Sequence, residues 1–357
     1  MSRRGLTFVV AGVAVAILVV LASILPVPYI VLVPGPVTDT LGKVPGTTTP
    51  VVSVEGARTY PTSGHVFLTT VGVLPASCDN HPTLIQALRA WFNSTEAVEP
   101  HQVQCPPGES SSKVQQQNEA DMSNSQRDAV TAALLHLGYK PTSQQIIVTD
   151  LVDGSPAAKA LEVNDAILAI NGEQVTDVNK LRSLIEAAHP GDVLTMTIDR
   201  GGKQRDVKVG TIESTDGTHR TIIGIATNGF DLRATFDKPH VKIGIDPAEV
   251  GGPSAGLAFA LGIVDELTPG ALTGGKTVAV TGTIDGFGQV GPIGGIQQKV
   301  AGAHRNGATV FLAPASECAD ALAAAPKSMT IAKVTTLSSA IDALNAIRSG
   351  STSYARC

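Results

Sequence analysis

The feature that most restricts the fold is an uncharged stretch of twenty residues, Leu6 to Leu25, preceded by Arg3 and Arg4. A helix of about 20 apolar residues spans the hydrocarbon core of a bilayer. Basic residues stay on the cytoplasmic side of such a helix, so the chain after Pro26 is expected outside the cytoplasmic membrane. A cleaved signal peptide is the alternative, but its apolar region is usually only about 7 to 15 residues long. We therefore expect a membrane anchor within residues 1–30.

Composition indicates a globular body and excludes one class of partner. Hydrophobic residues make up 43% of the 357 residues and charged residues only 16%, which leaves enough apolar side chains for a sizeable core. The length fits two domains of roughly 150 residues each. The net charge is -5, and Lys and Arg form no cluster beyond the N-terminus, so binding to nucleic acid is excluded.

The four cysteines would lie in an oxidising compartment if the chain leaves the cytoplasm, and an even number permits disulfides. Sequence alone allows three pairings. Cys78 and Cys105 bracket one polar insertion, so we favour this bond, which leaves Cys318 with Cys357. Four unpaired thiols are the alternative if the topology is different.

After the anchor, turn-rich and periodic segments alternate. Pro26 to Pro36 is rich in proline and cannot continue a helix, so an extended linker is expected. Residues 99–124 are polar and contain Pro106-Pro107-Gly108, which indicates a surface loop. The periodic segments predict strands at Val51–Val54 and Val66–Val73, and helices at Leu84–Phe92 and Gln126–Leu137.

Residues 144–210 have a different rhythm and form a compact module. A strand ends at the Asn171-Gly172 turn, a helix follows, and two hairpin strands flank Gly201-Gly202. The run from Asp153 to Gly172 resembles a PDZ domain of the permuted type found in bacterial extracytoplasmic proteases. The resemblance implies that an extended peptide C-terminus adds to the sheet as a strand. A small structural α/β insert is the alternative.

The segment Gly251-Gly252-Pro253-Ser254-Ala255-Gly256 precedes an apolar run from Leu257 to Val264. Here the chain is expected to turn sharply and enter a buried helix. Ser254 would lie at or next to the N-cap, where free backbone N–H groups and the helix dipole favour developing negative charge. That position suits a nucleophile beside an oxyanion hole, although an ordinary capping serine has the same pattern.

A second segment, Gly291 to Lys299, leads into a helix that ends near Asn306-Gly307. At 100° per residue, Lys299 falls on the apolar stripe of this helix, between Ile296 and Ala303. A lysine there either reaches outward or is desolvated, and desolvation lowers its pKa from about 10.4. A neutral amine can accept a proton from serine, which is the basis of Ser-Lys catalysis.

Together with Thr281-Gly282-Thr283, these two segments resemble the proteolytic domain of Lon-type peptidases over Ile243–Pro314. The similarity is greatest to small membrane-anchored PDZ-Lon proteins of the bacterial cytoplasmic membrane, which lack an ATPase. It implies that Ser254 is the nucleophile, that Lys299 is the general base and that Thr281 hydrogen-bonds and orients the lysine.

The oxyanion hole is expected to consist of backbone N–H groups. Our candidates are those of Ser254 and of Gly251 or Gly252, because Pro253 has no N–H. The chain departs from the ATP-dependent Lon enzymes at Gly251, where those enzymes usually carry an acidic residue.

The resemblance also implies an α+β fold in which a Lon-type proteolytic domain contains an inserted PDZ domain and follows one transmembrane helix. Tyr60 to Val71 looks like the first core strands of the anchored family, which makes the peptidase domain discontinuous. The expected boundaries are 1–30 for the anchor, 31–140 for the linker and first Lon-type segment, 141–212 for the PDZ-like domain, 213–348 for the catalytic segment and 349–357 for a tail.

Two other motifs are set aside. Gly270 to Thr277 satisfies the Walker A pattern, but a helix precedes it and a strand follows, the reverse of a P-loop. Gly252 to Gly256 fits the G-x-S-x-G pattern of α/β-hydrolases. Those enzymes need a later histidine, and His304 follows the serine too soon for the remaining hydrolase strands.

The sequence therefore predicts an ATP-independent serine endopeptidase that cleaves unfolded or flexible proteins and peptides outside the cytoplasmic membrane. No cofactor and no metal are expected, since the eight histidines are scattered without ligand spacing. The PDZ domain would bind peptide C-termini or regulate access, and Lon-like folds imply a homo-oligomeric ring. A non-catalytic anchored PDZ adaptor is the rival, but such a scaffold has no physical need for a lysine on an apolar stripe.

Overall fold

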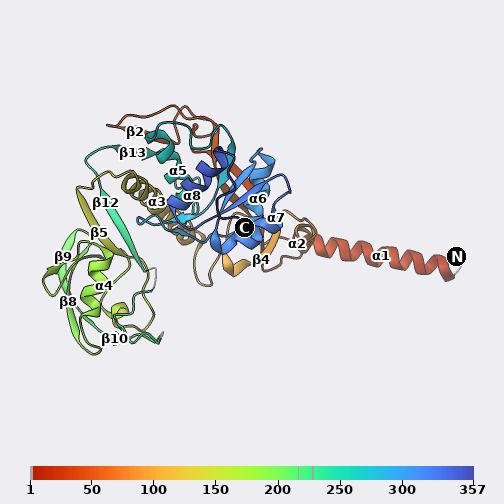
Figure 1. The fold of residues 1–357 in the computed structure, drawn as a ribbon. Helices are drawn as coiled ribbons and strands as arrows, with labels where there is room; N and C mark the ends of the chain where they lie inside the picture. The colour runs from red at the N-terminus through yellow and green to blue at the C-terminus, as the bar shows by residue number, and fades with distance from the viewer. Residues whose placement is uncertain (1–2, 216, 227–228) are drawn as a thin grey trace.

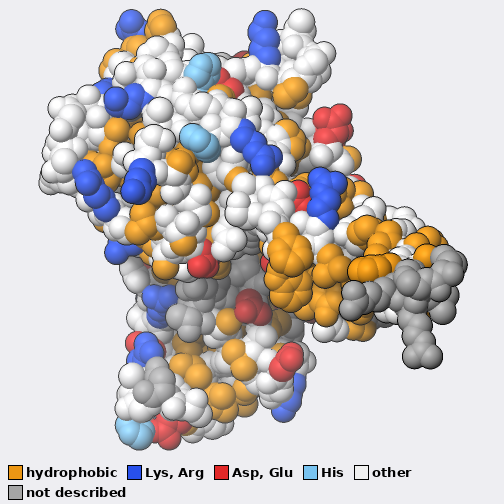
Figure 2. All heavy atoms as spheres, turned by 90° about the vertical axis from the view of Figure 1, so that its right-hand side faces the viewer, with side chains coloured by type: hydrophobic (Ala, Val, Ile, Leu, Met, Phe, Trp, Pro, Cys, Tyr) orange, Lys and Arg blue, Asp and Glu red, His pale blue; other side chains and the backbone are white. Residues whose placement is uncertain are grey.

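The computed structural model describes residues 3–215, 217–226 and 229–357. Helix α1 (Arg3–Ile24) projects from a larger body, and a smaller domain lies on the side of that body away from α1 (Figure 1). Within α1, the segment Thr7–Ile24 is long and apolar enough to cross a membrane, and none of it is buried against the body. Figure 2 shows that the side chains of this projecting helix are predominantly hydrophobic.

A mixed six-stranded sheet forms the centre of the body, in the order β18-β17-β14-β3-β1-β4. Its strands are β1 (Tyr29–Asp39), β3 (His65–Leu74), β4 (Ala97–Pro100), β14 (Thr277–Val280), β17 (Val310–Pro314) and β18 (Thr330–Val334). Strand β14 pairs in parallel with both β3 and β17. Strands from before and after the smaller domain therefore complete one sheet, and the discontinuous domain expected from the sequence is confirmed.

Helices cover both faces of this sheet because alternate strand residues point to opposite sides. Val278 and Val280 of β14 belong to the core under α3, α5 and α8, whereas Ala279 between them packs under α6 and α7. These helices are α3 (Ser111–His136), α5 (Gly256–Leu267), α6 (Ile296–Arg305), α7 (Cys318–Ala324) and α8 (Leu337–Arg348). Helix α5 is apolar on all sides from Gly256 to Val264 and is buried along nearly its entire length, as the sequence predicts.

The prediction of a surface loop over residues 99–124 is wrong, because much of this range is helix α3. The structure places β4, the short helix η1 (His101–Val103) and the first half of α3 in that range. Ser110 caps α3 by accepting a hydrogen bond from the N–H of Lys113. The first turns of α3 are polar because they face solvent, and the buried face begins only at Met122.

The prediction of an extended linker from Pro26 to Pro36 is wrong, because most of this segment belongs to strand β1. Val31 to Asp39 pairs with β3 on one side, and Tyr29 to Leu32 pairs with β4 on the other. Pro36 is accommodated because it lies in the register shift between Pro34 and Val37, at a bulge where no ladder hydrogen bond is needed.

A second sheet, of antiparallel strands in the order β12-β5-β6-β8-β9, forms the smaller domain. Its elements are β5 (Ser143–Val148), η2 (Ala157–Lys159), β6 (Ala166–Ile170), β7 (Glu173–Gln174), α4 (Val178–Glu186), β8 (Val193–Arg200), β9 (Lys203–Gly210) and β12 (Phe230–Thr235). Strand β12 pairs with β5 along its whole length. The second sheet thus extends past residue 212, the expected end of the PDZ-like domain, to Thr235.

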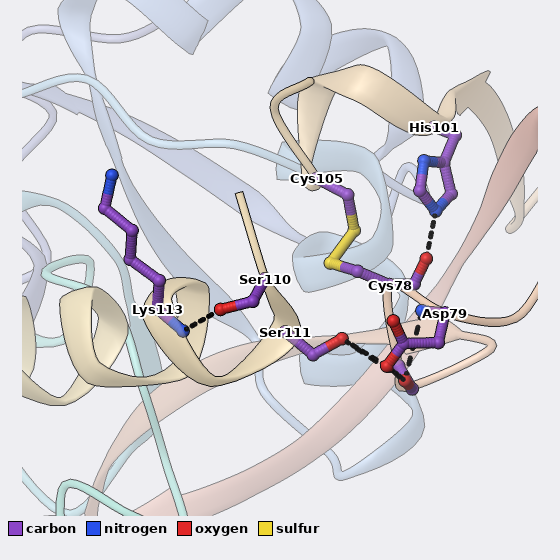
Figure 3. Close-up of a disulfide and its surroundings, with 8 residues drawn as sticks. Cys78, Asp79, His101, Cys105, Ser110, Ser111 and Lys113 are labelled. Carbon is purple, nitrogen blue, oxygen red and sulfur yellow. Dashed lines mark hydrogen bonds between the residues drawn. A yellow bond between two sulfur atoms is a disulfide. The ribbon is translucent and has the colours of Figure 1, made fainter. Parts of the chain in front are cut away.

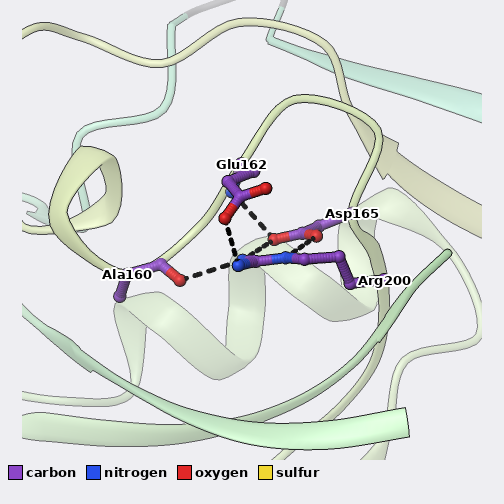
Figure 4. A network of polar contacts seen from close by, with 4 residues as sticks. All are labelled: Ala160, Glu162, Asp165 and Arg200. Atoms are coloured by element: carbon purple, nitrogen blue, oxygen red, sulfur yellow. Dashed lines mark hydrogen bonds and ion pairs between the residues drawn. The ribbon is translucent and has the colours of Figure 1, made fainter. Parts of the chain in front are cut away.

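An ion-pair cluster stabilises the smaller domain internally (Figure 4). Arg200 binds both carboxylate oxygens of Asp165, at 2.6 Å each, and also contacts Glu162 and the carbonyl oxygen of Ala160. The Asp165 side chain is fully buried, so this bidentate pair fixes the loop before β6 to the end of β8.

Short strand pairs complete the fold. Strand β2 (Val52–Glu55) pairs with β13 (His240–Ile243), β10 (Ile212–Glu213) with β11 (Thr221–Ile222), and β15 (Thr283–Ile284) with β16 (Val290–Gly291). Helices α2 (Leu84–Trp91) and η3 (Ala315–Glu317) lie between strands of the first sheet in the chain.

Both favoured disulfides, Cys78–Cys105 and Cys318–Cys357, are formed. Figure 3 shows that Cys78–Cys105 joins the loop after β3 to the segment between η1 and α3. Beside it, Ser111 at the start of α3 donates a hydrogen bond of 2.8 Å to Asp79. The disulfide and this bond together hold the beginning of α3 against the loop before α2.

Candidate active site

A cleft of about 800 Å³ lies where the first sheet meets α3 and the start of α5. Ser254 and Lys299 both line it, together with Met122 of α3 and Val71 of β3. Residues separated widely in the sequence therefore converge on one concave surface, as a binding or catalytic site requires.

Ser254 lies immediately before α5, whose N-cap is Ala255, close to the expected position. Its carbonyl oxygen accepts hydrogen bonds from the N–H of Gly282 at 3.0 Å and from Thr281 Oγ1 at 3.3 Å. From the other side, Ser125 Oγ of α3 donates to the carbonyl oxygen of Pro253 at 2.8 Å. The backbone that carries the serine hydroxyl is thus fixed on both sides.

Lys299 lies on the buried face of α6, and only 3% of it is exposed. Its Nζ is 2.7 Å from Ser254 Oγ and 3.1 Å from Thr281 Oγ1. The ammonium donates both hydrogen bonds; once the amine is neutral, the serine hydroxyl can donate to it instead. The three residues predicted from the sequence therefore meet at one nitrogen atom.

Burial lowers the pKa of Lys299 to about 7, and the negative charge of Glu317 opposes part of this shift. No carboxylate within the described ranges forms a salt bridge with the ammonium. A large share of the lysine is thus neutral near pH 7, so the group can accept a proton there.

The glycines before Ser254 differ in what their N–H groups can do. The N–H of Gly252 donates to the carbonyl oxygen of Asn118 in α3 at 2.9 Å, so it is not free to bind an oxyanion in this structure. Those of Gly251 and Ser254 have no hydrogen-bond partner among the residues that the structure describes. The N–H groups of Gly251 and Ser254 are therefore the remaining candidates for binding an oxyanion.

Asn118 also explains why position 251 carries glycine. A Cβ atom at Gly251 would lie 2.8 Å from the Cβ of Asn118, which is closer than such atoms approach each other. An acidic side chain at this position, as in the ATP-dependent enzymes, requires α3 or the loop to move.

Ser125 and Asn118 are the site residues that sequence reasoning missed. A signal for Ser125 was present, because this polar residue lies on the same helical face as Met122 and Ala129, both buried. It is the same signal that identified Lys299. Asn118 left no signal, since it contributes a backbone carbonyl and a Cβ contact, which do not depend on its amide group.

The motifs set aside lie elsewhere. His304 is exposed on α6, and it makes no hydrogen bond to Ser254. Gly270 to Thr277 connects the end of α5 to β14, the reverse of the strand-to-helix order that a P-loop needs.

Two family models match the chain. The C-terminal proteolytic domain of Lon protease (S16) matches residues 171–346, and a PDZ domain matches residues 122–211. The chain contains a Lon-type proteolytic domain and a PDZ domain. The matched ranges overlap over 171–211, where the structure has β7 to β9 of the second sheet; β5 and β6 of the same sheet lie in the part that the PDZ model alone matches.

Parts of the chain are similar to named Lon proteases and to a solved PDZ domain. Lon protease of Clostridioides difficile (strain 630) is 31% identical over 165 residues, which cover 44% of this chain and 19% of that protein. Lon protease 1 of Bacillus subtilis (strain 168) is 44% identical over 75 residues, 21% of this chain and 9% of that protein. The alignments thus span less than a fifth of either relative. The solved PDZ domain of an SdrC-like protein from Listeria monocytogenes is 24% identical, with a TM-score of 0.23 over 24% of this chain and 90% of that one.

Proposed function

We propose that this protein is an ATP-independent serine endopeptidase in which Ser254 is the nucleophile and Lys299 the general base. The observation that carries the proposal is the 2.7 Å contact between Lys299 Nζ and Ser254 Oγ, made by a buried lysine in a Lon-type protease domain. A Ser-Lys pair needs no histidine, and the exposed position of His304 fits this mechanism.

The geometry supports an acyl-enzyme route. Neutral Lys299 takes the proton from Ser254 Oγ as that oxygen attacks the peptide carbonyl carbon. The N–H groups of Ser254 and Gly251, next to the N-terminus of α5, stabilise the oxyanion that develops. The protonated lysine then gives its proton to the departing amine, and water hydrolyses the ester with Lys299 again as base. Thr281 keeps Nζ aligned through its 3.1 Å contact.

ATP independence and location form the second part of the proposal. The segment that fits the Walker A pattern connects helix α5 to strand β14, and this order argues against a phosphate-binding loop. The apolar helix α1 is proposed as a single-pass anchor with the protease domain on the outer side of the cytoplasmic membrane. Two disulfides favour this topology, because such bonds persist in oxidising compartments.

The substrates are proposed to be unfolded or flexible proteins and peptides, since nothing in the proposed mechanism unfolds a folded domain. The PDZ domain would bind peptide C-termini or regulate access to the cleft. A homo-oligomeric ring stays a prediction from the resemblance.

Cleavage of casein by the full chain in detergent, without nucleotide, tests the function. We expect proteolysis that added ATP does not change, and a serine-reactive fluorophosphonate that attaches to Ser254, as located by mass spectrometry of the digested protein. A folded protein that leaves casein intact and forms no adduct would instead favour the adaptor. An adduct on a different serine would contradict the assigned nucleophile.

The dependence of kcat/KM on pH gives an independent check of Lys299. The base must be neutral, so activity on a fluorogenic peptide should fall tenfold for each pH unit below a midpoint of about 7 and level off above it. Circular dichroism at each pH controls for unfolding. A midpoint near 10, the range of an exposed lysine, would show that burial does not tune this amine.

A further inference from the structure

Helix α2 (Leu84–Trp91) has its large apolar side chains on the outside. The residues that it turns to the body are small, Ala87 and Ala90, the latter only 1% exposed. The opposite face carries Ile85, Leu88, Trp91 and the C-cap Phe92, of which the last two are 75% and 88% exposed. Soluble proteins normally bury such side chains, so this face is expected to meet a partner that is itself apolar.

The position of α2 identifies that partner. The N–H of Leu84 donates to the carbonyl oxygen of Leu25, one residue after α1, at 2.9 Å. The N–H of Val27 donates to Pro82 at 3.0 Å, and Pro26 bridges to the N-cap Thr83. Figure 1 shows α2 directly at the base of α1. A bilayer spanned by α1 would therefore have its surface at α2.

The spacing and type of the exposed residues fit the boundary of a bilayer. Ile85, Leu88 and Phe92 follow each other at intervals of three and four residues, so they form one stripe along α2, with Trp91 beside it. Aromatic side chains, tryptophan above all, concentrate where acyl chains meet head groups. Amphipathic helices bind there by burying their apolar face about 5–10 Å deep.

We propose that α2 is a second membrane contact, in which Ile85, Leu88, Trp91 and Phe92 insert into the head-group boundary of the bilayer that α1 spans. This inference rests on the proposed anchoring by α1. The contact fixes the orientation of the body, which a single anchoring helix leaves free to tilt.

The orientation matters because β4, which contacts α2, forms part of the wall of the cleft. Glu99 of β4 and Val103 of η1, which follow α2 in the chain, both line the cleft that holds Ser254. A body seated on the bilayer through α2 therefore presents this wall of the cleft close to the membrane. The substrates that fit this arrangement are polypeptide segments held at the bilayer surface.

Trp91 is the only tryptophan in the chain, so the protein carries its own probe. The full chain is reconstituted into phosphatidylcholine/phosphatidylglycerol vesicles, with or without bromine near the head-group end of the acyl chains. We expect a blue-shifted Trp91 emission that loses most of its intensity in brominated vesicles and that acrylamide in the aqueous phase quenches weakly. Sedimentation of the same vesicles in alkaline carbonate reports separately on the anchor.

The variant Ile85→Ser/Leu88→Ser should return Trp91 to an aqueous emission while the protein stays in the vesicle pellet and still cleaves a soluble peptide. Leu322→Ser is the control, because Leu322 is an exposed leucine on α7, 52% exposed against 44% for Leu88, and its replacement should change nothing. Loss of the wild-type protein from the pellet would refute the anchor itself. Two outcomes with the protein still in the pellet would refute the membrane contact of α2. In one, only acrylamide quenches Trp91, which would place it in water. In the other, neither acrylamide nor bromine quenches it, which would indicate that Trp91 contacts a protein surface.

Discussion

Replacing Lys299 with Met should lower kcat for peptide cleavage by about 10²- to 10⁴-fold, the usual contribution of a general base. Methionine is similar in length and fills the buried site, so the loss reports the missing amine rather than a cavity. Ser254→Ala should reduce activity at least as much, and the double variant should be no worse than the more severe single one, because the two groups act as one unit. Steady-state kinetics with a fluorogenic peptide measures all three.

The same Lys299→Met variant should be more stable than the wild type below pH 7. The pKa of Lys299 is lower in the folded protein, about 7, than in the unfolded chain, about 10.4. Between these values the unfolded state binds more protons, so the lysine's penalty grows as the pH falls and is complete below pH 7. Thermal unfolding of both proteins at pH 6 and pH 9 should show the larger difference in unfolding temperature at pH 6.

His304→Ala is the control for the activity measurements and should retain most of the turnover. An inactive His304→Ala variant would favour the α/β-hydrolase interpretation instead.

Gly256→Ala should lower activity by about 10²-fold, because it displaces the nucleophile without touching either catalytic side chain. A Cβ atom at Gly256 would lie 2.7 Å from Ser125 Oγ and 2.8 Å from Ile284 Cγ2. Both neighbours are buried, so the start of α5 must shift, and Ser254 Oγ moves with it away from Lys299.

Two further variants make the Gly256 result specific. Ser125→Ala removes the atom nearest to the new methyl group, so the double variant should be less impaired than the product of the two single effects. Gly294→Ala adds a Cβ atom with nothing within 4 Å and should leave the unfolding temperature unchanged. A Gly256→Ala enzyme with normal kcat would show that the serine tolerates movement at this helix start.

The proximity of Ser254 and Lys299 could be predicted from the sequence because the chemistry of a lysine conflicts with an apolar surrounding. A lysine on an apolar stripe has to be explained by function, and the structure places Lys299 beside Ser254. The roles of backbone N–H groups in the site were harder to predict from the sequence. Whether the N–H of Gly252 is free depends on Asn118, a residue far away in the sequence, and no local pattern announces that contact.

The misjudged elements share one physical cause, which is that long-range contacts override local signals. Prolines in β1 indicate a linker, but pairing on both sides makes the segment a strand of the central sheet. The polar first half of α3 indicates a loop, but the helix is stabilised by packing of its second half on α5. Strand β12 carries too weak a pattern to be recognised without its partner β5.

Only residues 25–28 separate the end of α1 from β1, and β1 is a strand of the sheet that also lines the cleft. Leu32, which lines the cleft, follows Ile24 by eight residues, so at about 3.3 Å per residue it lies within about 26 Å of the end of α1. If α1 spans a bilayer as proposed, this short connection sets the distance between the bilayer surface and the cleft. Membrane-held substrates should be cut at a distance set by this strand, whatever their sequence, and lengthening the connection would move the cut outward.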